Sequence, residues 1–579
     1  MKKLFFIIPL LALFLAACSN ETAEPEIDHE GPEDVKRSCI TVALYAPAPT
    51  TRVGEYENGL PSENKVNTIR FFFFKEGGEF KEEGEPCMVF KQAATGSYLS
   101  YIDWIPSGND LNDIGDSGIT VEKIASATLG LNQPADEKLP SLVLAVINPT
   151  QDILALENPK LGDLKKLVGN YYDGLHDSNF LITNSVYVDK EGDEITATHI
   201  TEANFGDPTN EESMEKMQPI EIFVERVLAR LDFSLQLKED TNPSLTVNGN
   251  TIYKVSNPSV DGKESEVYVN FLGWNVTATS NTSRAIKMIN PRWNEDIFGE
   301  QSNPWYFPQY HRSFWAINPK GLTYNYGDFY NAKAEDIPEG DNSVTVYLQE
   351  NAADYKEDLS PVGPETPTCV IIGAQLVNSE GQPLCLARWA NRYYTQDNLL
   401  IEVADVLNLF QQTPTENGEV SFDQIAPEYL KFVSPDAVTL PDGETPESYS
   451  AYVQLNDEGK KITWYNGKSL DATRLTTDEA NSYILNRVNY VLVWTTGYTY
   501  YYFDIRHLGD EGNAGYYGIV RNHLYKANLT GISGLGTPVF DPDKVIYPTK
   551  PSPDDDILNV NVNILEWRIV TQDYELTWP

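Results

Sequence analysis

Cysteine, histidine and basic residues are scarce in this chain of 579 residues. It has five cysteines and six histidines, and its 43 Lys and Arg face 85 Asp and Glu, which gives a formal net charge of -42. The shortage of basic residues argues against nucleic acid and anionic membrane surfaces as partners, because both are bound through basic patches. An acidic, self-repelling surface is typical of a soluble extracellular protein, so we expect no nucleic-acid partner.

The motifs of common catalytic and metal sites are also missing. The sequence contains no H-E-x-x-H, G-x-S-x-G, P-loop or G-x-G-x-x-G motif, and its histidines do not stand at metal-ligand spacing. The segment "NDLNDIGDSG" carries Asp110, Asn112 and Gly115 of a calcium loop. However, Ile114 occupies a ligand position, and Val121 stands where the loop needs a bidentate Glu. We therefore expect no enzyme activity, no metal site and no cofactor.

An apolar run from Leu4 to Ala17 follows two lysines at the start of the chain. The run is shorter than the ~20 residues that a membrane-spanning helix needs, so it predicts a signal peptide over residues 1–18. "LAAC", ending at Cys18, resembles a bacterial lipobox, in which the cysteine is lipidated. By the same resemblance, Ser19 indicates sorting to the outer membrane. The alternative is a secretory signal that contains a cysteine by chance.

Four further cysteines are Cys39, Cys87, Cys369 and Cys385. None belongs to a C-x-x-C motif, and only Cys369 and Cys385 are near each other in the sequence. A disulfide between these two is compatible with an oxidising envelope, but their spacing does not predict it. We therefore expect stability to come from the burial of apolar side chains.

A strand-like segment lies near the start of the chain, after an acidic, Pro-containing stretch that we expect to be an extended tether. In "CITVALYAPAPTTR", Ile40, Val42 and Leu44 alternate with more polar residues, a pattern typical of a strand with one buried face. The proline-interrupted end of the segment leads to Arg52. This strand is thus separated from the rest of the chain.

A second isolated strand lies near the end of the chain, in "DDDILNVNVNILEW". Its apolar face comprises Leu558, Val560, Val562 and Ile564. It follows a Pro/Asp-rich spacer over 541–556, which at ~3.3 Å per residue reaches at most about 50 Å. A strand without a partner in its own body can complete the sheet of a neighbour, with main-chain hydrogen bonds supplying affinity. If the strand at residues 40–44 were removed, it would leave an apolar groove for such a tail, and repeated head-to-tail insertion would build a filament.

Between these two segments the sequence is mainly β, with a few helices. Strands are predicted in "VNTIRFFFFKEGG", "SLVLAVINP", "VTVYLQE", "TCVIIGAQLV" and "GYTYYYFDIRHL", and one long strand is predicted in "IEIFVERVLARLDFSL". Helices are predicted in "DILALENPKLGDLKKLVGNYY" and "TQDNLLIEVADVLNLFQQ". Tyr498, Tyr500 and Tyr502 share one strand face, where core packing is the more usual role and a ligand platform the alternative. The pattern predicts two β-sandwiches with inserted helices.

The chain resembles a Bacteroidales-type fimbrillin, the shaft subunit of the type V pilus, and is most similar to the minor-fimbrium major subunit. The resemblance is carried by the lipobox at Cys18, by the leader strand before Arg52, and by "VNTIRFFFF" and "VERVLARLDFSL". It is strongest at the C-terminus, in "YYYF", "VRNHLYKANLTGISGLGTPVF" and "DILNVNVNILEWRIVTQDYELTW".

The resemblance implies two transthyretin-like β-sandwich domains, over 53–224 and 225–579, the second including the linker 541–556 and a donor strand in 557–579. It also implies that residues 19–52, the tether and leader strand, are removed by an arginine-specific protease. Arg52 is the expected cleavage site, because cutting at Arg37 leaves the leader strand attached and Arg70 lies inside a predicted strand.

The same resemblance implies function and partners. The lipidated precursor is held at the outer membrane, and the donor strand of one copy replaces the leader of the next. The partners are other copies of the chain, with tip and anchor pilins, and the fimbria supports adhesion and biofilm formation. Two alternatives remain open: a tip or accessory adhesin, and a surface lipoprotein that binds glycans.

Overall fold

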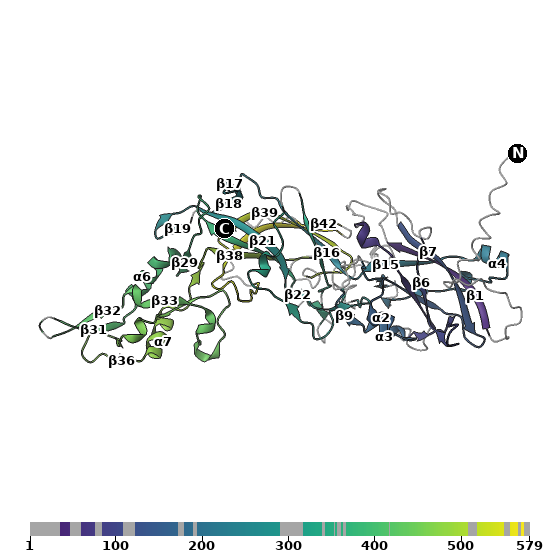
Figure 1. Ribbon diagram of the computed structural model, residues 1–579, viewed down its shortest axis with the longest axis horizontal. Coiled ribbons are helices and arrows are strands. Elements are labelled where there is room, and N and C mark those ends of the chain that lie inside the picture. Colours follow the sequence, from purple (N-terminus) through teal and green to yellow (C-terminus); the bar gives the residue numbers. More distant parts are fainter. Residues whose placement is uncertain are drawn as a thin grey trace.

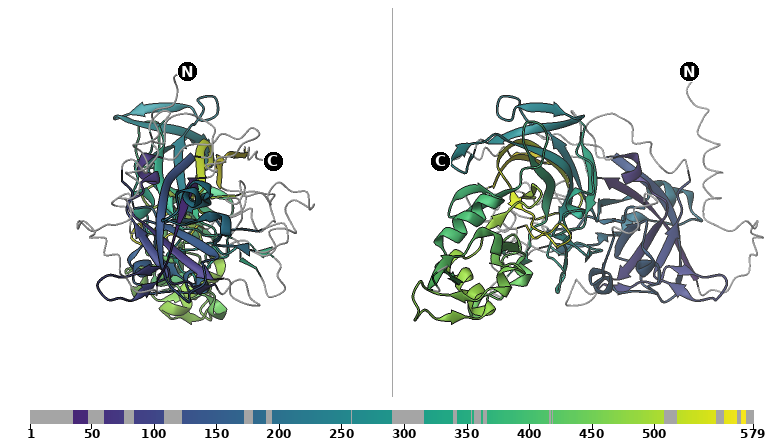
Figure 2. Two further views of the ribbon diagram at one scale, coloured as in Figure 1. Left: turned by 90° about the vertical axis from the view of Figure 1, so that its right-hand side faces the viewer. Right: turned by 60° about the vertical axis from the view of Figure 1, so that its left-hand side comes forward.

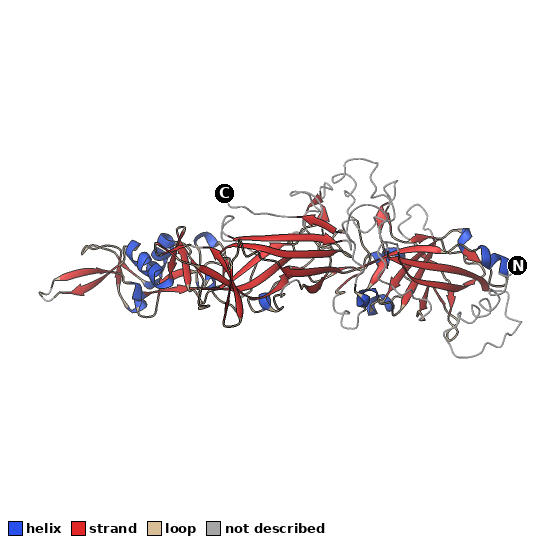
Figure 3. Cartoon of the chain, turned by 90° about the horizontal axis from the view of Figure 1, so that it is seen from above, coloured by secondary structure: helices blue, strands red, loops and turns tan. Residues whose placement is uncertain are grey.

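The computed structural model describes residues 35–46, 60–75, 84–107, 122–171, 179–188, 194–256, 258–289, 316–338, 342–352, 354–355, 361–362, 366–415, 417, 419–507, 518–548, 556–565 and 569–572. In these residues the chain is mainly β, which confirms the predicted fold class. It is elongated, with β-rich bodies at one end and in the middle, and with most of the longer helices at the other end (Figures 1 and 3). No helix in the described ranges is long and apolar enough to cross a membrane.

The N-terminal body is built on one sheet with the strand order β14-β1-β15-β10-β8-β2-β3, in which β7 pairs with β1, β6 with β2 and β13 with β8. The bounds of these strands are β1 Val35–Ala46, β2 Ile69–Lys75, β3 Glu85–Pro86, β6 Tyr101–Trp104, β7 Glu122–Pro134, β8 Leu142–Ile147, β10 Ile182–Asn184, β13 Thr198–His199, β14 Phe205–Gly206 and β15 Ile220–Arg226. Short helices flank the sheet: α2 Gln151–Leu154, α3 Leu161–Lys165 and α4 Glu211–Lys216.

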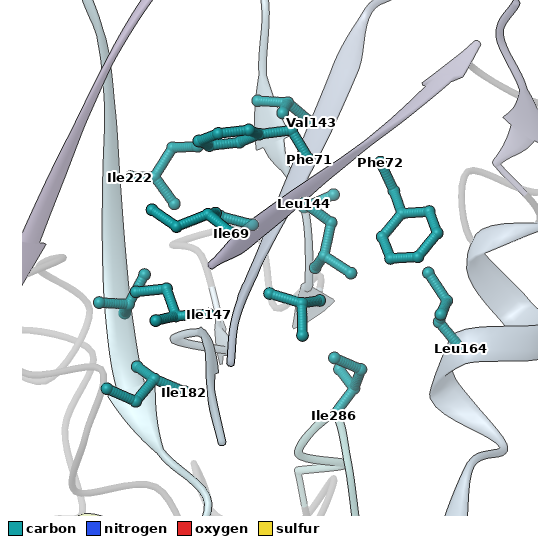
Figure 4. Packing of buried hydrophobic residues seen from close by; sticks show 14 of the residues in the cluster. Ile69, Phe71, Phe72, Val143, Leu144, Ile147, Leu164, Ile182, Ile222 and Ile286 are labelled. Atoms are coloured by element: carbon teal, nitrogen blue, oxygen red, sulfur yellow. The ribbon is translucent and has the colours of Figure 1, made fainter. Parts of the chain in front are cut away.

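Strand β2 is buried on both of its faces, which explains its run of four consecutive phenylalanines, residues 71–74. Phe71 and Phe72 point to opposite sides of the strand, Phe71 towards Ile222 of β15 and Phe72 towards Leu164 of α3 (Figure 4). Both phenylalanines are completely buried. Because successive side chains of a strand point to opposite faces, a strand covered on both sides needs apolar residues at every position.

The C-terminal body is a sandwich of two sheets, and apolar residues from both sheets form one core between them. One sheet has the order β25-β16-β39-β41-β42, with bounds β16 Ala229–Leu235, β25 Val344–Leu348, β39 Leu524–Gly534, β41 Asp556–Leu565 and β42 Ile569–Gln572. The other has the order β17-β18-β21-β28-β38-β40, with bounds β17 Ser244–Val247, β18 Asn250–Ser256, β21 Val267–Thr277, β28 Cys369–Val377, β38 Tyr498–Asp504 and β40 Thr537–Pro538. Figure 2 shows this body beside the N-terminal one.

The prediction of one long strand in "IEIFVERVLARLDFSL" is wrong. The structure divides this segment into β15, in the N-terminal sheet, and β16, in the C-terminal sheet. The two residues between them, Val227 and Leu228, are buried in the N-terminal core. Apolar residues recur through the whole segment, and no Gly, Pro or Asn marks a turn between the two strands, so the sequence pattern does not reveal the crossing from one sheet to the next.

A third group of buried residues lies within 387–493, around helices α6 (Gln396–Val406) and α7 (Thr477–Val488). The prediction of helix α6 is confirmed, whereas α7 was not predicted. Its signal is the capping box in which Thr476 Oγ1 accepts from the backbone N–H of Glu479. The strands of this unit include β31 Phe410–Pro414, β32 Val420–Gln424, β33 Leu430–Val433 and β34 Tyr452–Leu455.

The predicted helix in "DILALENPKLGDLKKLVGNYY" is present only as the two short helices α2 and α3. The interruption falls at Asn158 and Pro159, where Asn158 has a φ of 47°. Proline disfavours helical backbone in the residue before it, and a left-handed residue cannot continue an α-helix.

A buried polar network joins the two β bodies. Glu63 is completely buried; its carboxylate accepts from the Tyr347 hydroxyl at 2.6 Å and lies 3.3 Å from Arg230 Nη1. The backbone carbonyl of Glu63 also accepts from Arg226 Nε at 2.9 Å. Burial lowers the pKa of Arg226 to about 10. Arg230 also pairs with Asp232, and Arg226 also donates to Asn522. Glu63 contacts both arginines and Tyr347, so its removal takes away the partner that these residues of the junction share.

We expect Glu63→Ala to lower the free energy of unfolding by about 3 kcal/mol, because the buried Arg226 loses its nearby carboxylate and the Tyr347 hydroxyl loses its acceptor, while Arg230 keeps its pair with Asp232. Urea unfolding followed by circular dichroism measures this change. The matched control is Glu212→Ala, which removes a surface ion pair with Lys216, where the Glu212 side chain is 75% exposed. It should change the free energy of unfolding by no more than about 0.5 kcal/mol. If the two variants had the same urea concentration at the unfolding midpoint, Glu63 would not stabilise the junction.

Candidate functional site

The strand that carries the predicted leader, β1, is an inner strand of the N-terminal sheet (Figure 1). Along one edge it pairs antiparallel with β7 over its full length, from Val35 opposite Pro134 to Ala46 opposite Glu122. Along the other edge it pairs in parallel with β15 and antiparallel with β14. Between Cys39 and Tyr45, β1 therefore has hydrogen-bonded neighbours on both of its edges.

The apolar side chains of β1 point into the N-terminal core. Ile40 and Val42 are completely buried, and Leu44 is 1% exposed. They stand directly opposite small or aliphatic residues of β7, with Ile40 facing Leu129 and Val42 facing Ala127. The alternation seen in the sequence thus places these three leader residues on one face, against the core.

Removing β1 would open a slot lined by apolar residues. The β7 side of this slot carries Ala125, Ala127, Leu129 and Leu131, and the β15 side carries Ile220, Ile222 and Val224; all seven are at most 5% exposed in the present structure. These lining residues were not identified from the sequence. Their signal is the alternation in "IASATLGL" and in "IEIFV", which matches the pattern of the leader itself.

The arginines considered as cleavage sites differ in their surroundings. Arg52 and the lipobox residue Cys18 lie outside the described residues. Arg37 is exposed within β1. Arg70 is held in β2 by two hydrogen bonds to the Asp103 carboxylate, at 2.6 and 2.7 Å, and its guanidinium lies 3.8 Å from the Tyr101 ring centroid. A protease would have to dismantle this sheet to reach Arg70.

The strand that carries the predicted donor residues, β41, pairs with a strand of its own chain. It runs antiparallel to β39, from Leu565 opposite Leu524 to Asp556 opposite Gly534, and this ladder includes Leu558, Val560, Val562 and Ile564. On its other side β41 pairs with β42. The prediction that this strand has no partner in its own body is therefore wrong. The structure instead uses it to cover the outer edge of β39, an edge that would otherwise expose unpaired backbone groups.

The other candidate features are accounted for by packing. Tyr500 is 2% exposed and, with Tyr498 and Tyr502, belongs to a small apolar cluster, so this tyrosine stripe packs against the body. Cys369 and Cys385 are both thiols rather than a disulfide. No group of three or more His, Cys, Asp or Glu that could hold a metal occurs in the described ranges, which do not include the "NDLNDIGDSG" segment.

Comparison with known proteins identifies a family at the C-terminus. Residues 493–573 match the family described as major fimbrial subunit protein type IV, fimbrillin, C-terminal. These residues include β38, β39, β41 and β42. The resemblance to fimbrillins stated from the sequence is therefore confirmed for this part of the chain. No match is found among curated proteins.

Solved structures give further similarities. A fimbrilin from Porphyromonas gingivalis W83 aligns at 11% identity over 92% of this chain and 98% of its own, with a TM-score of 0.35. A putative cell adhesion protein from Parabacteroides distasonis ATCC 8503 aligns at 12% identity over 91% and 95%, with a TM-score of 0.34. A tip fimbrial protein from Porphyromonas gingivalis aligns at 9% identity over 90% and 99%, with a TM-score of 0.27. The match to the fimbrillin family model covers residues 493–573 alone.

Substitution of Leu44 tests how strongly β1 is held in the uncut chain. We expect Leu44→Ala to lower the free energy of unfolding by about 2–5 kcal/mol, because it leaves a cavity against β7 and β15. Lys36→Ala is the control, since Lys36 lies on the same strand but is exposed. If the urea unfolding curves of the two variants coincided, they would contradict the packing of β1 described above.

The number of reactive thiols shows whether β1, which carries Cys39, leaves the protein after cleavage. In the folded, uncut chain we expect fast modification of Cys385, which is exposed, and slow modification of the buried Cys39, Cys87 and Cys369. Burial raises the pKa of Cys87 to about 12 and the pKa of Cys369 well above its usual value, so both stay protonated and unreactive.

After cleavage at Arg52 and loss of the leader, denatured protein should have lost the Cys39 thiol while keeping the other three. Titration with a chromogenic thiol reagent before and after trypsin measures this loss. Retention of the Cys39 thiol in washed, cut protein would show that the leader stays bound.

Proposed function

We propose, from the premise that this chain ends in a fimbrillin-type C-terminal region, that it is a structural subunit of a cell-surface fimbria. The proposal rests above all on the inner position of β1, because a strand with a neighbour on each side leaves a closed slot when it departs. The match of residues 493–573 supports the family, and the acidic composition supports an extracellular place. We assign no catalytic role to the chain.

Assembly then proceeds in three steps. The precursor, lipidated at Cys18, is held at the outer membrane until an arginine-specific protease cuts after Arg52. The leader, with Ile40, Val42 and Leu44, leaves the N-terminal sheet. Strand β41 of another copy enters the slot, and repetition builds a head-to-tail filament that carries tip and anchor pilins and supports adhesion and biofilm formation.

The hydrogen-bonding positions of the two strands favour this exchange. In its own body β41 pairs along its full length with β39 on one edge and, over 562–565 only, with its hairpin partner β42 on the other. In the slot it would lie between β7 on one side and β14 and β15 on the other, where β1 has six paired residues on the second edge. Each additional backbone hydrogen bond contributes roughly 1 kcal/mol net, so the longer pairing along the second edge favours the exchanged position.

The side-chain pattern of β41 also suits the slot. Leu558, Val560, Val562 and Ile564 repeat every second residue, as do Ile40, Val42 and Leu44 in the leader. Burying four such side chains is worth about 6–12 kcal/mol. Ordering a free tail would cost about 1–2 kcal/mol per residue, and much of this cost has been met in the uncut chain, where β41 is already a strand. Exchange gives up the ladder to β39, so the ladders to β7 and β15 have to replace it.

The decisive experiment is limited proteolysis of the purified precursor with trypsin. We expect ladders of polymer that resist mild detergent, because all contacts of an inserted strand must separate together. Deleting residues from Asp556 onward should abolish the ladders. Deleting only 573–579, beyond β42, is the control and should leave them. If the variant that lacks all residues from Asp556 onward still formed polymer, β41 would not be the donor.

A further inference from the structure

The first half of the spacer that leads to β41 is fixed to its own body. Ile546 is 6% exposed, and its backbone N–H donates to the carbonyl of Gly327 at 2.7 Å. The carbonyl of the next residue, Tyr547, accepts from the Tyr500 hydroxyl at 2.7 Å. Tyr500 is itself buried in β38. The spacer is therefore anchored to the core of the C-terminal body up to Tyr547.

Contacts on either side of Ile546 strengthen this anchor. Lys544 Nζ pairs with Asp436 Oδ2 at 2.6 Å, and Val545 forms a β-bridge with Asp328. The ring of Tyr547 packs against Tyr326, with centroids 5.0 Å apart. Because a backbone bridge, an ion pair and ring packing all hold the same short segment, it can stay in place when β41 alone moves.

The anchor shortens the reach of the donor strand. The described structure follows the chain to residue 548, and β41 begins at Asp556, so seven residues, 549–555, lie between them. At ~3.3 Å per residue, the eight steps from residue 548 to Asp556 span at most about 26 Å. This is about half the reach of the full spacer. A slot that receives β41 must therefore open close to Tyr547.

Apolar side chains are exposed at this point. Val545 and Tyr547 are each 45% exposed, and Tyr330, which follows the bridged Asp328 by two residues, is 49% exposed. A recess of about 280 Å³ lies between the spacer and the body, and Tyr449 and Phe540 are among its lining residues. We call the surface formed by Tyr330, Val545 and Tyr547 the spacer face.

We propose that the spacer face is a contact surface for the N-terminal body of the next copy of this chain in the filament. The inference rests on the proposed function, since it concerns the partner that receives β41. The short connection brings that copy within reach of Tyr547, and the exposed apolar side chains lose contact with water when the two bodies meet. The hinge of the exchange then lies after Tyr547, and the spacer before it belongs to the rigid body.

The test places a photo-crosslinking amino acid, p-benzoylphenylalanine, at Val545 of the full-length precursor. After trypsin and illumination, we expect crosslinks between two copies, and peptide mapping should locate them in the N-terminal body of the second copy. The same probe at Leu245, which is 39% exposed in β17, is the matched control. The Val545 probe should crosslink several-fold more than the Leu245 probe.

A second variant tests the role of the short connection. A long Gly/Ser insert before Thr549 should leave the polymer ladders intact but lower the crosslink yield at Val545, because a flexible connection no longer brings the bodies together.

The outcomes separate the two proposals. If polymer forms but the Val545 probe crosslinks no more than the Leu245 probe, the spacer face is not a contact surface, whereas the strand-exchange proposal is unaffected. Absence of ladders from the unsubstituted chain would overturn the proposed function and the spacer face with it. Loss of ladders with the Val545 probe alone, in a chain whose circular dichroism is unchanged, supports the spacer face as a contact.

Discussion

The pairing of β1 with a neighbour along each edge is the constraint on which the rest of the structure depends. An inner strand contributes two ladders and a row of buried side chains, so the N-terminal body is complete only with β1 in place. In the proposed exchange, the same position lets β1 be replaced as a unit. A segment of similar length and alternation would then pair with the two open edges, whereas a departing edge strand would leave only a surface.

The two β bodies repeat one arrangement, and this repetition relates the slot to the rest of the molecule. In the N-terminal body the first strand, β1, runs parallel to the last, β15; in the C-terminal body the first strand, β16, runs parallel to β39. Each first strand also has an antiparallel neighbour on its far side, β7 for β1 and β25 for β16. The slot is therefore shaped like the place that β16 holds permanently in the other body.

Local patterns allowed much of the fold to be predicted. The mainly-β class follows from alternation, and α6 follows from helical spacing in "NLLIEVADVL". Helix α7 also has a local signal, the capping box at Thr476, although it was overlooked. The crossing at Val227 and Leu228 has none, because no turn residue separates the strands of the two sheets.

The candidate site could likewise be predicted only in part from the sequence. The faces of β1 and β41 are local properties, and the sequence contains them. The partners of these strands are not local: nothing in "DILNVNVNIL" tells whether an edge of its own body, such as β39, is open to receive it. Strand register and neighbour depend on residues far away in the chain. The anchored spacer was missed for this reason too, since its contacts come from Gly327, Asp436 and Tyr500.

The unit around α6 and α7 has its own buried residues, drawn from 387–493, and contributes no strand to the slot or to the β39 edge. In the proposed fimbria, changes on its outer surface away from Asp436, which pairs with Lys544 of the spacer, are therefore uncoupled from polymer formation. Such a module can accept a grafted epitope while each copy of the proposed filament still fits the next. Repetition along a fibre would then display the altered surface many times over.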